Sequence, residues 1–427
     1  MREFHLNEKH PDIALVQTAL DRAGYSPGEI DGIFGILTLS ALNQFRFARN
    51  LPAERGRIAE SDWRALTPFL VGYVTHTVKR GDTLFALAKQ NKTSVRAIET
   101  ANPTIQLENL PIGQTLTIPL DFPVVATNIP FTATALHFAI HGLVVRYPQI
   151  KRQQIGQSVL GAPIDVLIFG EGEQQISYNA SHHGNEWITT PVLLKFLEQY
   201  ANAVASSGKI GDLEALALFE TSTLHLIPMV NPDGVDVAAG WLDRGAFYDF
   251  AKQLAADYPH FPFPDGWKAN IRGVDLNLQY PASWEKAREI KFAQGFTRPG
   301  PRDYVGSAVL SEPESRALYD YTMENDFVLT MSYHSQGKVI YWQYLDFLPP
   351  NSREIGEIFA ELSGYPLEET PFASGHAGYK DWFIQQFDRP AYTIEVGIGQ
   401  SPLPLEQFDE IYRDNVRMLA AGLDVLV

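Results

Sequence analysis

The chain contains no cysteine among its 427 residues. This absence excludes disulfide bonds, thiolate nucleophiles and cysteine-based zinc sites, so a metal ion in this protein must be bound by His, Asp or Glu. The sequence also has no basic run that could follow a phosphate backbone, and its formal net charge is −16, so nucleic acid is not an expected partner. No apolar run is long enough to span a bilayer, and we expect no membrane insertion.

What the chain does contain is typical of a globular protein with a large core. Hydrophobic residues make up 45% of the sequence and charged residues 20%, and a chain of this length usually folds as two or three domains. The first residues, MREFHLNEKHPDIALVQ, lack the apolar core of a secretory signal. We therefore expect a soluble protein without an export signal.

Residues 1–70 have a helical pattern interrupted by a turn. Ile13, Val16 and Leu20 recur at helical spacing, GYSPGEIDGIFG breaks the chain, and TLSALNQFRFARN resumes the helix. This pattern predicts a small helical bundle. The segment resembles a peptidoglycan-binding helical domain in its turn and in the residues after it, which are Asp31, Gly32, Phe34, Gly35, Thr38, Ala41 and Phe45. Each of these residues by itself is expected to serve the turn or the core.

Residues 71–121 alternate in the order strand, helix, helix, strand. The segment resembles a LysM domain in RGDTLF at its start, in Asn102-Pro103 after the second helix, and in Leu110, Gly113 and Leu116 near its end. The resemblance implies that it binds glycans containing N-acetylglucosamine, in a shallow groove near RGDTLF and the loop after Asn102. Leu84, Leu87 and Ile98 are expected in its core.

Residues 122–427 alternate strands with long helical patterns, as in PIDVLIFGEGEQQISYNAS followed by TTPVLLKFLEQYANAVA, which predicts an α/β domain. Its first strand-like segment ends in SHHGNEW. His182 and His183 precede Glu186 at spacings of four and three, so either histidine could share a helical face with the carboxylate. Spacing alone does not choose between them.

A catalytic zinc site usually takes three protein ligands, so a third ligand is expected elsewhere. His334 ends the apolar strand pattern FVLTMSYH, and Glu395 lies near the end of AYTIEVG. Because sites in α/β sheets form at the carboxyl ends of strands, we expect these residues to converge with His182 or His183 and Glu186.

Residues 131–427 resemble the zinc carboxypeptidase family. The family's zinc motif, His-x-x-Glu-Trp, falls on residues 183–187, its distant third ligand on His334, and its catalytic glutamate on Glu395. Further motifs follow in the family's order, among them IGQSVLGAPI, NPDG, RGVDLN and VGSAVLSEPE. The resemblance implies one Zn²⁺ bound by His183, Glu186 and His334, with Glu395 as general base. His182 is then a neighbour without an assigned role.

The resemblance also implies roles for the RGVDLN segment. Arg272 matches the arginine that stabilises the oxyanion, Asp275 the carboxylate that holds the first zinc histidine, and Asn277 an asparagine that helps bind the substrate's terminal carboxylate. The fold class it implies is multi-domain: a small all-α bundle at 1–70, a βααβ LysM module at 71–121, and an α/β/α catalytic domain with a central mixed, twisted sheet at 122–427.

The sequence departs from the family's carboxypeptidases after Asn277. They have an arginine there that clamps the free C-terminal carboxylate, whereas this chain has Leu278, which cannot form that ion pair. Their substrate-capping tyrosine is also missing, and His376 and Tyr379 are candidates to replace it. These departures favour an enzyme that cuts where the peptide continues past the scissile bond.

With its two wall modules, the chain resembles bacterial γ-D-glutamyl-L-diamino acid endopeptidases, which cut peptidoglycan stem peptides between γ-D-glutamate and diaminopimelate or lysine. The expected partners are therefore peptidoglycan glycan and stem peptides. Lys380 is predicted to pair with the second carboxylate of diaminopimelate.

Two alternatives stay open. One is an exo-acting carboxypeptidase that uses Lys268, Arg298 or Arg302 in place of the clamp, and the other is an inactive wall-binding protein. We expect synthesis in the cytoplasm or in a sporulating cell, with action on the wall or on wall fragments. The sequence predicts no oligomeric state.

Overall fold

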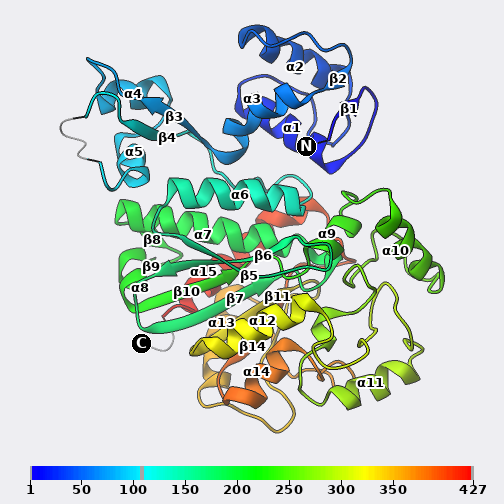
Figure 1. Cartoon of the computed structure of the whole chain (residues 1–427). Helices are drawn as coiled ribbons and strands as arrows, with labels where there is room; N and C mark the ends of the chain where they lie inside the picture. The colour runs from blue at the N-terminus through cyan, green and yellow to red at the C-terminus, as the bar shows by residue number, and fades with distance from the viewer. Residues whose placement is uncertain (1, 106–109, 425–427) are drawn as a thin grey trace. The chain divides into compact units, whose positions relative to one another are not determined.

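The computed structural model describes residues 2–105 and 110–424. Contacts within the chain divide it into two compact units, one of Met1–Ile129 with Thr134–Ile150 and one of Pro130–Ala133 with Lys151–Val427. Figure 1 shows the helices and strands of both. The expected segment boundaries, after residues 70 and 121, both fall inside the first unit.

Three helices form the N-terminal segment. They are α1 (Pro11–Arg22), α2 (Ile36–Ala48) and α3 (Glu60–Val71), accompanied by the short antiparallel strands β1 (Phe4–His5) and β2 (Arg57–Ile58). Ile13, Phe45 and Trp63, one from each helix, are fully buried. A buried ion pair joins α2 to α3, since Arg46 Nη2 lies 2.6 Å from Asp62 Oδ2. The predicted helical bundle is confirmed, with a two-stranded addition.

The next segment has the predicted order of strand, helix, helix and strand: β3 (Tyr73–Thr77), α4 (Leu84–Gln90), α5 (Val95–Ala101) and β4 (Thr115–Pro119). The two strands pair antiparallel, and Leu87 and Ile98 are buried while Leu84 is partly buried against them. The hydroxyl groups of Thr83 and Ser94 accept hydrogen bonds from the first turns of the two helices and so cap them. Residues 106–109, in the loop where the resemblance places part of the glycan groove, lie outside the described residues.

Helix α6 (Ala133–Arg146) follows, and from Thr134 it belongs to the first unit. Gly142 lets it approach the end of α3 closely, because a Cβ atom at this position would lie 2.3 Å from the carbonyl oxygen of Val71. Contacts therefore group α6 with the N-terminal helices.

An eight-stranded sheet forms the centre of the second unit. In spatial order its strands are β13 (Leu367–Glu368), β12 (Val339–Tyr341), β14 (Ala391–Glu395), β11 (Phe327–His334), β7 (Gln174–Ala180), β10 (Ser222–Ile227), β6 (Pro163–Gly170) and β5 (Lys151–Gln157). The central strands β14, β11, β7 and β10 run parallel, whereas β12, β6 and β5 join antiparallel on either side. The mixed sheet confirms the predicted α/β class.

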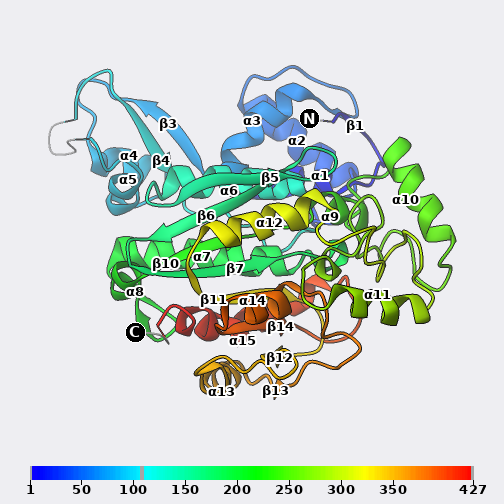
Figure 2. The same cartoon turned by 60° about the horizontal axis from the view of Figure 1, so that its bottom comes forward.

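Helices cover both faces of this sheet (Figure 2). Tyr178 of β7 stands beside Leu226 of β10, and its hydroxyl donates to the carbonyl of Leu419 in α15. Adjacent side chains of a strand point to opposite faces, so His225 points the other way and contacts Tyr321 of α12. The helices of the unit are α7 (Thr189–Ser206), α8 (Ala215–Thr221), α9 (Pro232–Ala238), α10 (Ala246–Ala256), α11 (Trp284–Ala293), α12 (Pro313–Glu324), α13 (Ser352–Ser363), α14 (Tyr379–Phe387) and α15 (Phe408–Ala421).

Shorter elements complete the unit: the strand pair β8 (Lys209–Ile210) and β9 (Leu213–Glu214), and the 3₁₀ helices η2 (Gly184–Glu186), η3 (Leu276–Leu278) and η4 (Leu405–Gln407). Within the described part of the chain, no helix combines the length and the apolarity that crossing a membrane requires.

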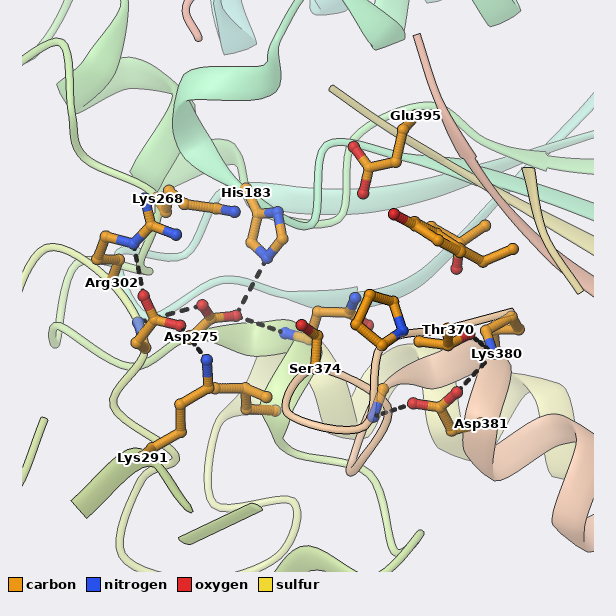
Figure 3. Close-up of a pocket in the computed structure, with 17 residues that line it drawn as sticks. His183, Lys268, Asp275, Lys291, Arg302, Thr370, Ser374, Lys380, Asp381 and Glu395 are labelled. Carbon is orange, nitrogen blue, oxygen red and sulfur yellow. Dashed lines mark hydrogen bonds and ion pairs between the residues drawn. The ribbon is translucent and has the colours of Figure 1, made fainter. Parts of the chain in front are cut away.

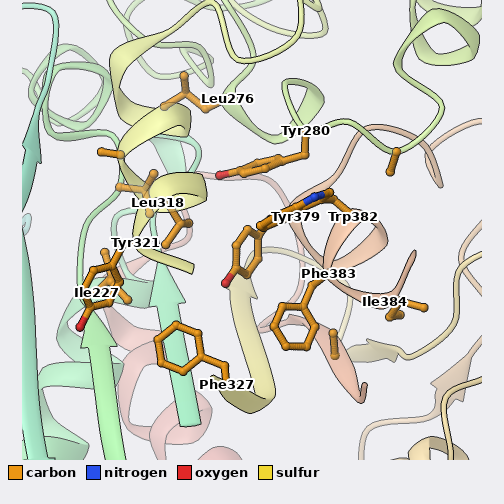
Figure 4. Packing of buried hydrophobic residues seen from close by; sticks show 14 of the residues in the cluster. Ile227, Leu276, Tyr280, Leu318, Tyr321, Phe327, Tyr379, Trp382, Phe383 and Ile384 are labelled. Atoms are coloured by element: carbon orange, nitrogen blue, oxygen red, sulfur yellow. The ribbon is translucent and has the colours of Figure 1, made fainter. Parts of the chain in front are cut away.

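A cluster of buried hydrophobic residues fills the space between α12, α14 and the sheet (Figure 4). Leu318 comes from α12, Phe327 from β11, and Tyr379, Trp382 and Phe383 from α14. This packing holds α12 and α14 against the sheet.

Candidate active site

Three strands of the sheet end at one edge. β7 ends at Ala180, shortly before His183, while β11 ends at His334 and β14 at Glu395. β11 and β14 are parallel neighbours, with His334 opposite Glu395. Because the carboxyl ends of parallel strands share an edge, residues far apart in the sequence are brought together here, as expected.

The backbone after β7 is shaped by close contacts. Gly184 N donates to the carbonyl of Lys268 at 2.9 Å, and a Cβ atom on Gly184 would lie 2.3 Å from the carbonyl oxygen of Gly234. The side-chain amide of Asn231 donates to the carbonyl of His182 at 3.1 Å. The NPDG segment therefore has a structural function, which is to hold the turn that presents the two histidines.

His183, Glu186 and His334 form a compact cluster of metal-binding groups. His183 Nδ1 lies 2.9 Å from Glu186 Oε1, His334 Nδ1 lies 3.0 Å from Glu186 Oε2, and the two Nδ1 atoms are 3.2 Å apart. All three residues are buried, and their donor atoms lie within 4.8 Å of one another. Two imidazoles and one carboxylate make a donor set that suits Zn²⁺ and leaves a coordination position for water.

His182 does not join this cluster. Its Nε2 lies 3.1 Å from the hydroxyl of Tyr280, and its ring stacks on that of His334 with centroids 5.5 Å apart. Burial, with the nearby His334, lowers the pKa of His182 well below its ordinary value, so the ring is neutral. His182 therefore packs behind a candidate ligand.

Asp275 lies on the far side of His183. Its Oδ1 is 3.1 Å from His183 Nε2 and also accepts a hydrogen bond from Asn277 N. Burial by itself would raise the pKa of the Asp275 carboxyl, but the charges of His183 and Lys268 lower it well below its ordinary value. An ionised carboxylate on Nε2 keeps Nδ1 free to bind a metal, which further fits the cluster to zinc.

Glu395 is the remaining carboxylate at this edge, and Figure 3 shows it directed into the same hollow as His183. Burial and then the charge of Glu186 raise its pKa to about 8. A carboxylate with a raised proton affinity beside a metal-binding cluster can act as a general base.

Two hollows open beside the cluster, with volumes of about 260 and about 250 Å³. Both are lined by Lys268, Arg302 and Glu395. Lys268 Nζ lies 3.2 Å from Glu186 Oε1. Burial would lower the pKa of Lys268, but the charge of Glu186 raises it above its ordinary value, so Lys268 is a cation next to the cluster.

Arg272, the expected oxyanion-stabilising residue, lies elsewhere. Its side chain is 53% exposed, and Nη1 lies 3.5 Å from Glu312 Oε2. It does not line either hollow of the described structure. Lys268, four residues earlier, is instead a cation that lies beside the cluster, and its backbone carbonyl accepts a hydrogen bond from Gly184 N.

The predicted substrate-binding residues have varied surroundings. Asn277 lines the first hollow, with Nδ2 3.5 Å from His334 Nε2. Leu278 lines the same hollow, so an apolar side chain stands where a clamp would be.

Lys380 also reaches the first hollow, but its Nζ is surrounded by three oxygen atoms. They are the Gln343 carbonyl at 2.6 Å, the Thr370 hydroxyl at 3.1 Å and Asp381 Oδ1 at 2.6 Å. The predicted contact between Lys380 and diaminopimelate would replace one of these partners and stays a prediction.

Tyr379 and His376 do not reach either hollow of the described structure. The Tyr379 ring is fully buried in the α14 cluster, and its hydroxyl lies 3.0 Å from that of Thr322. His376 is buried beside Phe372, with ring centroids 4.9 Å apart. Neither is placed to cap a substrate in this conformation.

Sequence reasoning missed Lys291 and Asp303, which also line the first hollow. Lys291 Nζ lies 2.5 Å from Asp303 Oδ1, and Asp303 N donates to Asp275 Oδ2 at 3.2 Å. Neither residue belongs to a recognised motif, so the sequence contained no signal that could have found them.

Comparisons with known proteins agree with this geometry. Family models match residues 137–418 as zinc carboxypeptidase, residues 76–119 as LysM domain and residues 9–55 as peptidoglycan binding domain. The chain is 43% identical over 285 residues to gamma-D-glutamyl-L-diamino acid endopeptidase 1 of Lysinibacillus sphaericus, covering 66% of this chain and 70% of that protein. It is 39% identical over 283 residues to the uncharacterized protein YqgT of Bacillus subtilis, covering 65% and 73% of the two chains.

Solved structures support the fold. Thrombin activatable fibrinolysis inhibitor matches with a TM-score of 0.54 at 15% identity, over 83% of this chain and 98% of that one. Carboxypeptidase A from Helicoverpa armigera matches with a TM-score of 0.51 at 17% identity, over 92% and 96% of the two chains. Together with the matched family model and the buried His-Glu-His cluster, these findings show that the chain belongs to the zinc carboxypeptidase family.

Proposed function

We propose that this zinc peptidase hydrolyses the bond between γ-D-glutamate and the diamino acid, diaminopimelate or lysine, in peptidoglycan stem peptides. Membership in the family makes the chain a hydrolase, and its LysM and peptidoglycan binding modules support peptidoglycan as the partner. The observation that carries the finer proposal is the 43% identity, over 285 residues, to an endopeptidase named for this bond.

His183, Glu186 and His334 would hold the zinc ion. A bound Zn²⁺ supplies Lewis acidity, which polarises the scissile carbonyl and lowers the pKa of water. Asp275 supports the site by holding the His183 ring from Nε2. This contact sets which ring nitrogen is protonated and fixes the orientation of the imidazole.

Glu395 acts as the general base. Its carboxylate takes a proton from the attacking water and then delivers it to the leaving amine nitrogen, so that the amine leaves neutral. Lys268 points its ammonium group at the same space, where negative charge develops on the carbonyl oxygen. A buried cation stabilises such charge strongly because little water screens it.

The two hollows favour cleavage inside a peptide. They adjoin the cluster and share Lys268, Arg302 and Glu395, so they leave room for substrate residues beyond the scissile carbonyl. Leu278 lines one hollow and offers no ion pair to a free terminal carboxylate. These features support an endopeptidase over an exo-acting carboxypeptidase.

Digestion of purified muropeptides tests the proposal. We expect release of intact fragments that begin with the diamino acid, identified by mass spectrometry. The Glu395→Gln variant should bind zinc but lose at least 10²-fold in activity. Release of single terminal residues would instead show an exo-acting carboxypeptidase, and no release by the zinc-loaded protein would show an inactive wall-binding protein.

The place of action is part of the proposal. Synthesis inside a sporulating cell with release on lysis, and recycling of wall fragments in the cytoplasm, both suit a protein with two wall-binding modules. Fractionation of the producing cells during growth and sporulation distinguishes them, because the protein would be found with the wall in one case and with the cytoplasm in the other.

A further inference from the structure

Arg302 stands beside Lys268 at the catalytic cluster. The backbone N–H groups of Lys268 and Ala269 both donate to the carbonyl of Pro301, at 2.8 and 3.0 Å, which brings the two cationic residues together. Figure 3 shows them on the same side of His183. Arg302 lines both hollows, so a ligand bound in either one lies within reach of its side chain.

The Arg302 side chain is held in place at one end only. Its Nε lies 2.5 Å from Asp303 Oδ2, and its guanidinium carbon lies 5.3 Å from the centre of the Phe261 ring. Among the described residues, no partner is found for its two terminal nitrogens, and the side chain is 36% exposed. The guanidinium therefore presents oriented N–H donors to the hollows.

The neighbouring cations are less available. Lys268 is paired with Glu186 and serves the carbonyl oxygen in the proposed function, and Lys291 is 12% exposed and paired with Asp303. Lys380 is surrounded by three oxygen acceptors. Among the described residues of the site, Arg302 is thus the cation whose terminal N–H groups are available to a ligand. Its planar guanidinium group can donate two parallel hydrogen bonds to a carboxylate.

A γ-linked glutamyl residue carries such a carboxylate close to the scissile bond. Its δ-carbon forms the peptide bond, which leaves the α-carboxylate free, roughly 5 Å away along four carbon–carbon bonds. An ordinary α-linked peptide has no negative charge at this point of the main chain. The two linkages therefore differ by one carboxylate near the reacting carbonyl.

We infer that Arg302 binds the free α-carboxylate of the γ-D-glutamyl residue and so determines the preference for γ-linked stem peptides. This inference rests on the proposed function and adds the residue that recognises the linkage. Amidation of the α-carboxylate would remove the negative charge and weaken the contact, so the amidation state of the wall peptide would control cleavage.

Two matched substrates test the inference in the full-length, zinc-loaded protein. They are a tetrapeptide of L-alanine, γ-D-glutamate, diaminopimelate and D-alanine, in which the chain continues past the scissile bond, and the same peptide with the α-carboxylate of the glutamyl residue converted to a carboxamide. We expect the wild type to cleave the free acid with a kcat/KM about 10- to 100-fold higher, since hydrogen bonds to charged groups are worth that much. The ratio of the two values is the readout, because general damage to a variant cancels in it.

Arg302→Gln should bring this ratio close to one by slowing cleavage of the free acid, and Arg302→Lys should give an intermediate ratio because it keeps the charge but loses the planar pair of donors. Arg298→Gln is the control. Arg298 is 61% exposed and lies 3.3 Å from Asp257, away from both hollows, so this variant should keep the wild-type ratio.

A wild type that cleaves both peptides equally would overturn the inference, as would a preference for the free acid that survives in Arg302→Gln. In both cases the proposed function would stand. If the zinc-loaded wild type cleaves neither peptide, the proposed function itself is wrong, and the inference falls with it.

Discussion

Lys268 keeps its charge in a buried site because Glu186 lies beside it. Moving an ammonium group out of water is costly, and the ion pair at 3.2 Å offsets that cost. Arg272, four residues later, is 53% exposed and lies 3.5 Å from the buried carboxylate of Glu312. Two cations close in the sequence thus differ in how strongly they can stabilise charge, since solvent screens the exposed one.

This difference predicts opposite outcomes for two substitutions. Lys268→Gln should lower kcat by about 10²- to 10³-fold, the effect of losing one oxyanion-stabilising donor, while zinc content is retained. Arg272→Gln should change kcat less than about threefold. Steady-state kinetics on a muropeptide substrate, with metal analysis of each variant, measures both. A large loss in Arg272→Gln with a small one in Lys268→Gln would restore the role that the family pattern implies.

At the scale of elements, His225 links its strand, β10, to helix α12 and to the neighbouring strand β7. Its Nδ1 lies 2.6 Å from the hydroxyl of Tyr321 in α12, and its Nε2 lies 2.7 Å from Gln175 Oε1 in β7. Burial lowers its pKa from 6.5 to about 4. The neutral ring therefore helps to hold α12 against the sheet, and its protonation opposes folding.

The sign of the resulting pH dependence follows from linkage. Between pH 6.5 and 4 the unfolded chain binds a proton at His225 that the folded chain does not, so the free energy of unfolding falls as the pH falls through this window. The loss reaches at most about 3 kcal/mol. Denaturant unfolding of the wild type and His225→Gln from pH 4 to 8 should show a flatter curve for the variant below pH 6.5. Parallel curves would contradict the assignment.

At the scale of the whole molecule, the metal cluster joins distant parts of the chain. His183 follows β7 and His334 ends β11, and the two residues are separated by 151 positions. An ion bound by both stabilises the folded state over the unfolded chain, because the unfolded chain does not hold the ligands together. Zinc should therefore contribute to stability as well as to catalysis.

Chelation tests this linkage. Removal of zinc should abolish activity and lower the Tm of the catalytic unit by roughly 5 °C or more, if free zinc is a hundredfold above its Kd. Zinc added back should restore both quantities. His334→Ala should be inactive and show no zinc-dependent shift in Tm. Activity that survives complete chelation would contradict a catalytic zinc site.

Local patterns in the sequence were sufficient for much of this molecule. The helical bundle of the first segment, the strand, helix, helix, strand order of the second and the alternation of strands and helices in the third follow from hydrophobic periodicity and turns, which are properties of neighbouring residues. The short strands β1 and β2 were not predicted. The convergence of His183, Glu186, His334 and Glu395 also follows from the sequence, because strand ends of a parallel sheet share one edge.

Spacing could not separate His182 from His183, because both are compatible with Glu186 on a helical turn. The turn is in fact a short 3₁₀ helix. It packs closely against the backbones of Lys268 and Gly234, and the side-chain amide of Asn231 donates to the carbonyl that precedes it. This arrangement directs His183 to the cluster and His182 to Tyr280. These contacts come from segments remote in the sequence, so no local rule contains them.

The sequence by itself determined the class of this protein, its modules and the chemical types of its metal-binding groups, because each depends on short patterns along the chain. Only the tertiary structure decided which cations face the cluster. Lys268 and Arg302 meet there through a backbone contact to Pro301, whereas Arg272 turns to the surface. Side-chain direction and burial depend on contacts between distant segments, and those contacts decide which charges can act on a substrate.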